Sequence, residues 1–160
     1  MRGACFAGSM LKSADDALAA RLRGVLPAAA FREVTDAYLQ EPRGTHRGRA
    51  GLVVAPGTVE EVAAVIRAAG AARVPGRGAA EGALPVVLSL ERMAAIRGVQ
   101  PEENVLVAEA GAVLESVQAA AGAAGRLFPL TLASQGSARI GGLLATNAGG
   151  VNVLRYGSAR

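Results

Sequence analysis

The chain has 160 residues, of which 51% are hydrophobic and only 3% aromatic, so it can form an aliphatic core and is not a disordered chain. Its net charge of +4 is carried almost entirely by scattered arginines, which argues against a nucleic-acid platform with a dense basic stripe and stacking aromatics. The single cysteine, Cys5, excludes an internal disulfide and a thiolate metal site.

The sequence shows no clear signal for export or membrane insertion. Its first residues are mildly basic without the apolar run of a signal peptide, and no segment reaches the length needed to span a membrane. We therefore expect a protein of the cytoplasm, or of the mitochondrial matrix if the organism is eukaryotic.

The first half of the chain predicts a helix followed by half of a βαβ unit. Apolar residues at helical spacing, with acids early and arginines late, predict a helix over 15–25. An apolar run at 52–54 predicts a buried strand, and Thr58 with Glu61 predicts a capping box for a helix that ends near Gly70. The buried face of this helix is expected to hold Val59, Val62, Val65 and Ile66.

The middle of the chain predicts strands separated by polar turns. Residues 73–75 have the composition of a strand entry, but a glycine-rich stretch at 76–82 interrupts it at once. The elements expected next are a strand at 84–90, a short helix or turn at 91–96, a polar turn at 100–104, a strand at 105–108 and a helix at 113–122. Gly125 is the expected end of that helix, with Val113, Leu114 and Val117 facing inward.

Glycine and small polar residues dominate the segment 134–150. Glycine lets a ligand lie against the backbone, whose N–H groups can donate to phosphate or carbonyl oxygens. Glycine pairs also form turns and let a helix pack closely against its neighbours. Spacing alone leaves both interpretations open.

The ordered string itself is more specific than its glycine content. The sequence FPLTLASQGSARIGGLLATNAGGVNVLRYGSAR resembles the second flavin-contacting segment of PCMH-type FAD-binding oxidoreductases, the vanillyl-alcohol oxidase superfamily. Within that superfamily it is most similar to the D-lactate, glycolate and D-2-hydroxyglutarate dehydrogenases. Upstream, YLQEPRGTHRGRAGLVVAPGTVEEVAAVIRAA and VVLSLERMAAIRGVQPEENVLVAEAGAVLESVQ resemble their first βα unit and the elements between the two flavin loops, so the resemblance covers most of 38–160.

This resemblance implies an α+β fold, the N-terminal part of a PCMH-type FAD-binding domain. A small βαβ subdomain is expected first, followed by the start of a mixed or antiparallel sheet subdomain. The expected domains are a helical extension at 1–37 and a partial FAD-binding domain at 38–160.

The resemblance also implies ten FAD-contacting residues: Pro129, Leu130, Gly136, Ser137, Gly141, Gly142, Thr146, Asn147, Gly149 and Gly150. The first two would flank the isoalloxazine ring, and the next two would lie against the ribityl chain and pyrophosphate. The following two glycines would let a short helix approach the cofactor, and the last four would complete the pocket. Residues 109–111 match a segment near the adenine end.

Two departures from the family pattern bear on activity. The family's pyrophosphate loop, Pro-x-Gly-Gly-x-Thr-Gly, is shortened here to the stretch near 76–85, where Arg77 lies in a glycine turn and no Thr-Gly follows. The family also continues into a substrate domain with metal-binding histidines and an acid. His46, the only histidine, is expected in a surface loop, so no metal site is expected and the catalytic residues are unknown.

The functional expectation is the FAD-binding segment of an oxidoreductase that oxidises a D-2-hydroxy acid of the D-lactate, glycolate or D-2-hydroxyglutarate type. The segment is expected to be incomplete as a catalyst alone, and to meet its substrate only if a C-terminal domain is supplied. The alternative is a non-catalytic truncated remnant, or a small nucleotide-binding module of the same fold.

Overall fold

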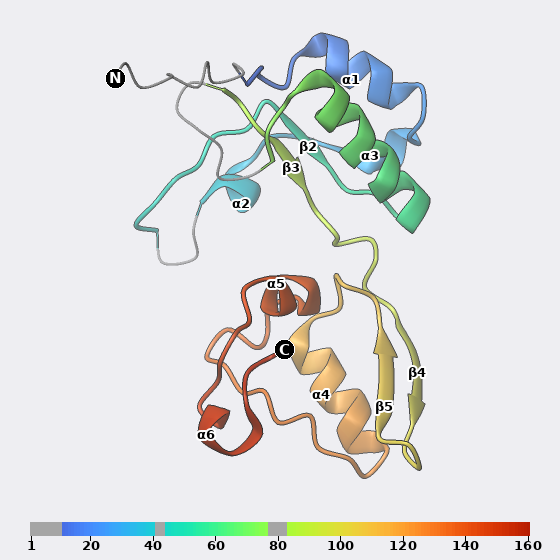
Figure 1. The fold of residues 1–160 in the computed structure, drawn as a ribbon, viewed down its shortest axis with the longest axis vertical. Helices are drawn as coiled ribbons and strands as arrows, with labels where there is room; N and C mark the ends of the chain where they lie inside the picture. The colour runs from blue at the N-terminus through green and yellow to red at the C-terminus, as the bar shows by residue number, and fades with distance from the viewer. Residues whose placement is uncertain (1–10, 41–43, 77–82) are drawn as a thin grey trace, which may run out of the picture. The chain divides into compact units, whose positions relative to one another are not determined.

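The computed structural model describes residues 11–40, 44–76 and 83–160, within two compact units, Met1–Ser89 and Leu90–Arg160 (Figure 1). Each unit combines helices with a small sheet, which confirms the predicted α+β class. The domain boundary predicted after residue 37 stays a prediction. No helix in the described ranges is long and apolar enough to cross a membrane.

The first unit is built on a three-stranded sheet in the order β1-β2-β3. Its elements are α1 (Asp16–Arg23), a 3-10 turn (Ala28–Ala30), β1 (Phe31–Arg32), α2 (Asp36–Leu39), β2 (Leu52–Val54), α3 (Val59–Ala72) and β3 (Val86–Leu88). Strand β1 pairs antiparallel with β2, and β2 pairs parallel with β3, with Leu52 opposite Val86. Thus β2, α3 and β3 form the predicted βαβ unit.

Both long helices of this unit begin at side-chain caps. Asp15 Oδ1 accepts a hydrogen bond from Leu18 N–H at 2.9 Å and starts α1. Thr58 Oγ1 accepts from Glu61 N–H at 3.2 Å, as predicted. The returning Glu61 carboxylate accepts from Gly57 N–H at 2.7 Å, one residue earlier than in the usual capping box.

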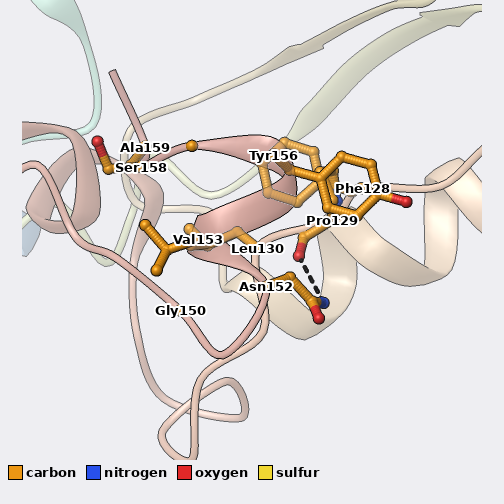
Figure 2. Close-up of a pocket in the computed structure, with 10 residues that line it drawn as sticks. Phe128, Pro129, Leu130, Gly150, Asn152, Val153, Tyr156, Ser158 and Ala159 are labelled. Atoms are coloured by element: carbon orange, nitrogen blue, oxygen red, sulfur yellow. Dashed lines mark hydrogen bonds between the residues drawn. The ribbon is translucent and has the colours of Figure 1, made fainter.

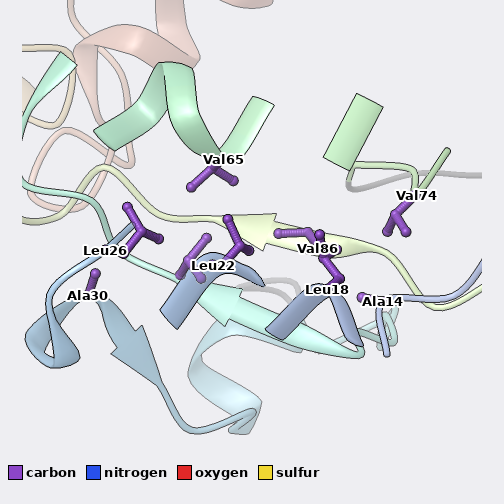
Figure 3. Close-up of a cluster of buried hydrophobic side chains, with 9 residues drawn as sticks. Ala14, Leu18, Leu22, Leu26, Ala30, Val65, Val74 and Val86 are labelled. Atoms are coloured by element: carbon purple, nitrogen blue, oxygen red, sulfur yellow. The ribbon is translucent and has the colours of Figure 1, made fainter. Parts of the chain in front are cut away.

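The core of the first unit lies where α1 and α3 pack together and over the sheet (Figure 3). Leu22 and Val54 are fully buried, and Val65 of α3 is 2% exposed. The predicted burial of Val59 and Ile66 is wrong, since they are 61% and 60% exposed. At about 3.6 residues per turn, both lie about 100–120° around the helix from Val65, beyond the face that meets the small sheet.

The strand entry predicted at 73–75 does not continue into a strand after α3. Arg73 ends the helix in the left-handed region, with a φ of 54°. Gly76 then makes only an isolated parallel bridge to Val86, the first residue of β3. The second parallel strand is therefore β3, within the apolar run predicted at 84–90.

The second unit begins with an antiparallel hairpin. Its elements are β4 (Ile96–Gln100), β5 (Val105–Ala108), α4 (Leu114–Ala123), α5 (Ile140–Ala145) and α6 (Val153–Tyr156). The helix or turn predicted at 91–96 is wrong at its end, because Ile96 already pairs with Ala108. The polar turn at 101–104 closes the hairpin, with Asn104 at a φ of 55°, and the antiparallel start of the second subdomain is confirmed.

Helix α4 carries the core of the second unit. Leu114 and Val117 are buried, as predicted, and Leu114 packs with Leu130 and Leu143. Gly125 follows the helix at a φ of 67°, where the left-handed conformation favours glycine.

Candidate functional site

A pocket of about 150 Å³ lies in the second unit, between the segment before residue 132 and α6 (Figure 2). Its lining is mostly apolar and includes an aromatic ring from each side: Phe128, Pro129, Leu130, Gly150, Asn152, Val153, Tyr156, Gly157, Ser158 and Ala159. The guanidinium carbon of Arg155 lies 5.3 Å from the centre of the Tyr156 ring and adds a positive charge beside the pocket.

Two side-chain amides fix the wall that contains Pro129 and Leu130. Asn152 Nδ2 donates to the carbonyl oxygen of Pro129 at 3.2 Å, the bond drawn in Figure 2. Gln118 Nε2 of α4 donates to the carbonyl oxygen of Leu130 at 2.8 Å. Because both bonds are to backbone oxygens, they hold the main chain in place whatever side chains face the pocket.

The glycines of the C-terminal segment divide into two kinds. A Cβ on Gly150 would collide with the carbonyl oxygen of Thr131, and one on Gly141 would lie 3.0 Å from Ala110. These two glycines let parts of the unit pack against each other, which is the structural interpretation left open by the sequence. A Cβ on Gly142, by contrast, would meet no atom within 4 Å.

Three exposed backbone amides in this segment are available to a ligand. Within the described part of the chain, the N–H groups of Gly136, Gly142 and Gly149 have no hydrogen-bond acceptor. All three glycines are solvent-exposed. Exposed N–H groups without a Cβ beside them are suited to donate to phosphate or carbonyl oxygens.

The polar side chains predicted for the site are engaged within the protein. Thr146 Oγ1 donates to the carbonyl oxygen of Gly142 at 2.9 Å, and Asn147 Oδ1 accepts from Arg160 N–H at 3.0 Å. Ser137 Oγ donates weakly to Ser134 at 3.3 Å. These groups retain further acceptor capacity, but their first hydrogen bonds stabilise the segment.

The structure thus brings together three of the ten predicted residues, Pro129, Leu130 and Gly150, around one pocket. The other seven do not line it, and their contact with a flavin stays a prediction. Sequence reasoning missed Asn152 and Tyr156 as lining residues. Both lie in the segment on which the resemblance to the flavin-binding family rests, shortly after the Gly149–Gly150 pair. That position in the sequence could have identified them as candidates.

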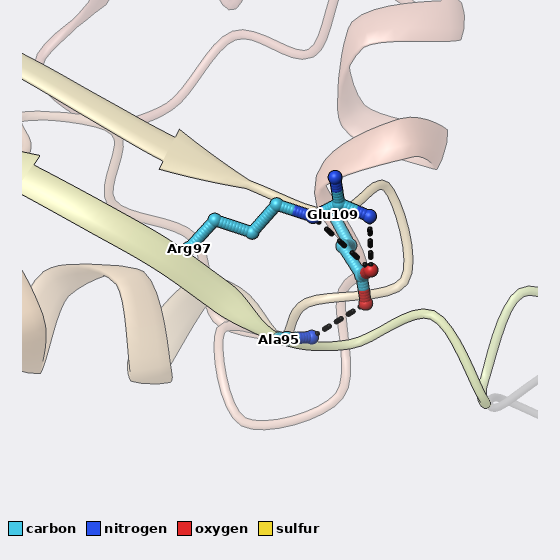
Figure 4. A network of polar contacts seen from close by, with 3 residues as sticks. All are labelled: Ala95, Arg97 and Glu109. Carbon is cyan, nitrogen blue, oxygen red and sulfur yellow. Dashed lines mark hydrogen bonds and ion pairs between the residues drawn. The ribbon is translucent and has the colours of Figure 1, made fainter. Parts of the chain in front are cut away.

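Glu109 was predicted near the adenine end of the cofactor. In the structure it follows β5 and accepts hydrogen bonds from residues at or just before the start of β4, which links the two strands of the hairpin (Figure 4). Its carboxylate accepts from Arg97 Nη2 at 2.7 Å and from Ala95 N–H at 2.9 Å. The hydrogen bond from Arg97, followed by that from Ala95, lowers the pKa of Glu109 below its ordinary value. Both bonds are internal to the hairpin, which gives Glu109 a structural role.

The predicted surface position of the histidine is confirmed, and the acidic pair of the hairpin turn is exposed as well. Glu102 and Glu103 are exposed in the hairpin turn. His46 is exposed, and its Nδ1 lies 3.0 Å from Thr45 Oγ1. In the described ranges no three His, Cys, Asp or Glu residues come together as a potential metal site. Arg77 and most of the shortened loop lie outside the described residues.

The pocket is large enough for one ring of a flavin. A cavity of about 150 Å³ in a protein interior can hold a benzene-sized ligand. The apolar lining and the two aromatic rings suit a flat ring system, and the exposed amides suit its polar atoms. The residues that line the pocket therefore fit part of an isoalloxazine ring.

Solved structures of larger enzymes share this architecture. An alkyldihydroxyacetonephosphate synthase superposes with a TM-score of 0.74 at 17% identity, over 93% of this chain and 35% of that chain. The glucose dehydrogenase Phl p 4.0202 superposes with a TM-score of 0.71 at 15% identity, over 91% of this chain and 34% of that one. At such identities the likeness is one of fold.

Residues 50–160 match the FAD binding domain family, and the chain belongs to that family. The family cofactor is FAD, so the resemblance predicted from the sequence is confirmed.

Among curated relatives, a D-2-hydroxyglutarate dehydrogenase of Xanthomonas citri pv. viticola is 43% identical over 120 residues, 68% of this chain and 25% of the relative. The mitochondrial D-2-hydroxyglutarate dehydrogenase of Bos taurus is 36% identical over 161 residues, covering 91% of this chain and 29% of the relative. A D-lactate dehydrogenase of Archaeoglobus fulgidus is 36% identical over 119 residues, covering 68% and 26%. The chain therefore spans a quarter to three-tenths of the length of these relatives.

Proposed function

We propose that this chain is the FAD-binding segment of a flavin-dependent oxidoreductase that oxidises a D-2-hydroxy acid. The match of residues 50–160 to the FAD binding domain family carries the proposal, and the names of the relatives supply the substrate class. The apolar pocket beside Tyr156 supports it, because it offers a flat ring an apolar surface. The free amides of the exposed Gly142 and Gly149, which lie outside the lining of that pocket, support it as hydrogen-bond donors for the polar atoms of the cofactor.

The roles of the individual residues follow from where they lie. Pro129, Leu130 and Tyr156 would hold one edge of the ring system, and Gly150, which also lines the pocket, packs closely against the backbone of Thr131. The amides of Gly136, Gly142 and Gly149, with Ser137, Gly141, Thr146 and Asn147 around them, would serve the polar parts of the cofactor. Bound FAD supplies the hydride acceptor for the oxidation of the hydroxyl-bearing carbon.

Substrate oxidation requires more protein than the described unit offers. The residues that bind the hydroxy acid would come from the part of the relatives that this chain does not cover. We propose that the segment is incomplete as a catalyst alone, and that its hydroxy acid and electron acceptor depend on that missing part. We propose the cytoplasm as its location, or the mitochondrial matrix if the organism is eukaryotic; the names of relatives from Bos taurus and Schizosaccharomyces pombe, which place those proteins in mitochondria, support the second.

One observation favours a second candidate, a non-catalytic remnant or small nucleotide-binding module. Gly76 pairs with Val86, so the chain before and after the shortened loop meets at the start of β3. The family uses this stretch to hold the pyrophosphate. A loop of this length would offer fewer hydrogen bonds to the pyrophosphate. The protein would then keep the fold but bind a dinucleotide such as FAD with lower affinity.

Titration with FAD and FMN distinguishes these proposals. We expect FAD to bind saturably, with quenching of flavin fluorescence, and Tyr156→Ala to raise its Kd at least fivefold through loss of the pocket wall. Leu154→Ala is the matched control, because Leu154 is fully exposed on the same helix and does not line the pocket. A folded wild-type protein that quenches neither flavin at millimolar concentration would contradict the FAD-binding proposal and favour the remnant.

A further inference from the structure

Helices α1 and α3 run side by side in the first unit (Figure 1). A second pocket, of about 350 Å³, is lined by residues of α1, of the segment before it and of the end of α3. Its walls come from 12–21 and 71–74, and the two walls are joined by a hydrogen bond from Lys12 N–H to the carbonyl oxygen of Arg73 at 3.0 Å. Such a volume is at the lower end of the range for small-molecule sites, about 300–1,000 Å³.

The charged groups around this pocket are mainly positive. Lys12, Arg21 and Arg73 line it, against a single acid, Asp15. The Asp15 carboxylate already accepts from Leu18 N–H at 2.9 Å as the cap of α1. Among the described residues, none of the three cations forms an ion pair. Their charges are therefore left for a ligand or for solvent.

The hydroxyl that lines the pocket is also engaged, which makes the cations its main free polar groups. Ser13 Oγ accepts from Leu84 N–H at 2.9 Å and holds the segment before α1 in place. The wall is thus held by the hydrogen bonds of Lys12 N–H and Ser13 Oγ, and the three cationic residues on it are exposed. The groups that hold the pocket wall in place are therefore different from the charged groups that could bind a ligand.

The conformation of Arg73 is unusual for its residue type. It ends α3 at a φ of 54°, where glycine is preferred and other residues lose about 1–2 kcal/mol. The residue in this left-handed turn is among those that line the pocket. A glycine would make the same turn without strain but would remove a guanidinium from the pocket.

We propose that this pocket binds a phosphate group, carried by a small phosphomonoester or present as free phosphate. Two arginines and a lysine around one cavity give the donor set that phosphate oxygens accept, with charge-assisted hydrogen bonds from the planar guanidinium groups. The volume leaves room for a small organic part attached to the phosphate. This site is separate from the proposed flavin pocket in both residues and ligand class.

The test is a ¹H–¹⁵N NMR titration of the full chain with inorganic phosphate and with glycerol 3-phosphate, at constant ionic strength set with sodium chloride. We expect saturable shifts at Lys12, Ala17 and Arg73. Arg73→Gly should raise the Kd about three- to fivefold, the weakening typical for the loss of one exposed charge. Its thermal midpoint should be no lower than that of the wild type, because glycine adopts this φ without strain. Arg67→Gln on the exposed part of α3 is the matched control and should leave the Kd unchanged.

The two ligand arms identify the source of the phosphate. Tighter binding of glycerol 3-phosphate supports a phosphomonoester, and equal binding supports free phosphate. Shifts that do not saturate, or that chloride reproduces at the same ionic strength, would overturn the proposal. A Kd that changes as much in Arg67→Gln as in Arg73→Gly would also overturn it, because general charge would then explain the binding.

Discussion

The glycines of the C-terminal segment can serve either contact with a ligand or turns and close packing. The substitution Gly142→Ala distinguishes these two explanations. Gly142 is the third residue of α5, it is exposed, and a Cβ there would meet no protein atom within 4 Å. Replacing a helical glycine with alanine should stabilise the free protein by about 0.5–1 kcal/mol. If the flavin lies against this backbone, the added methyl group would instead displace it. We then expect FAD affinity to fall about tenfold, or about 1.4 kcal/mol.

The assay measures urea unfolding without ligand and FAD binding by fluorescence quenching on the same samples. Gly122→Ala is the matched control, because Gly122 is an exposed helical glycine of α4 that also has open space at its Cβ position. It should gain a similar stability and bind FAD as the wild type does. If Gly142→Ala also binds FAD with unchanged affinity, the reasoning that this glycine admits the cofactor is refuted.

Three further predictions concern the framework of the two units. Gly150→Ala should destabilise the second unit by about 2–4 kcal/mol, because the Cβ would collide with the carbonyl oxygen of Thr131; a wild-type urea midpoint in the variant would contradict this. The lowered pKa of Glu109 implies stability that is present above pH 4.5, its ordinary pKa, and is lost as the pH falls through the lower folded value. The thermal midpoint of the second unit should therefore drop more steeply below pH 4.5 in the wild type than in Glu109→Gln, and equal slopes would count against it. Thr58→Ala should cost the first unit about 1 kcal/mol in urea unfolding through loss of the cap on α3, and no loss would show that Glu61 caps the helix alone.

Local signals made much of the fold predictable. The cap at Thr58, the glycine at Gly125 and the apolar run at Leu52–Val54 each act over a few residues, and each is found where the sequence placed it. Strand β4 was missed because Ile96–Gln100 holds an arginine, a glycine and a glutamine, so its pairing with β5 rather than its own composition decides its conformation.

Burial and the candidate site depended on contacts that no local pattern reveals. Ile66 has the helical spacing of a core residue, but the sheet beneath α3 is too narrow to cover it. Likewise, the sequence could not tell which glycines serve packing. Gly141 and Gly142 are adjacent, yet one faces Ala110 and the other faces open space. That difference arises from the path of residues 109–111, which lie some thirty positions earlier in the chain.

Binding of FAD against the glycine backbone of the second unit is tested most directly by the ¹H–¹⁵N NMR spectrum of the full chain during titration with FAD. The largest shifts are expected at the backbone amides of Gly136, Gly142 and Gly149 and at the pocket residues Leu130 and Tyr156. Saturable shifts at these positions would place the cofactor against the exposed glycine backbone. Saturable FAD binding that leaves these amides unmoved would contradict the central claim.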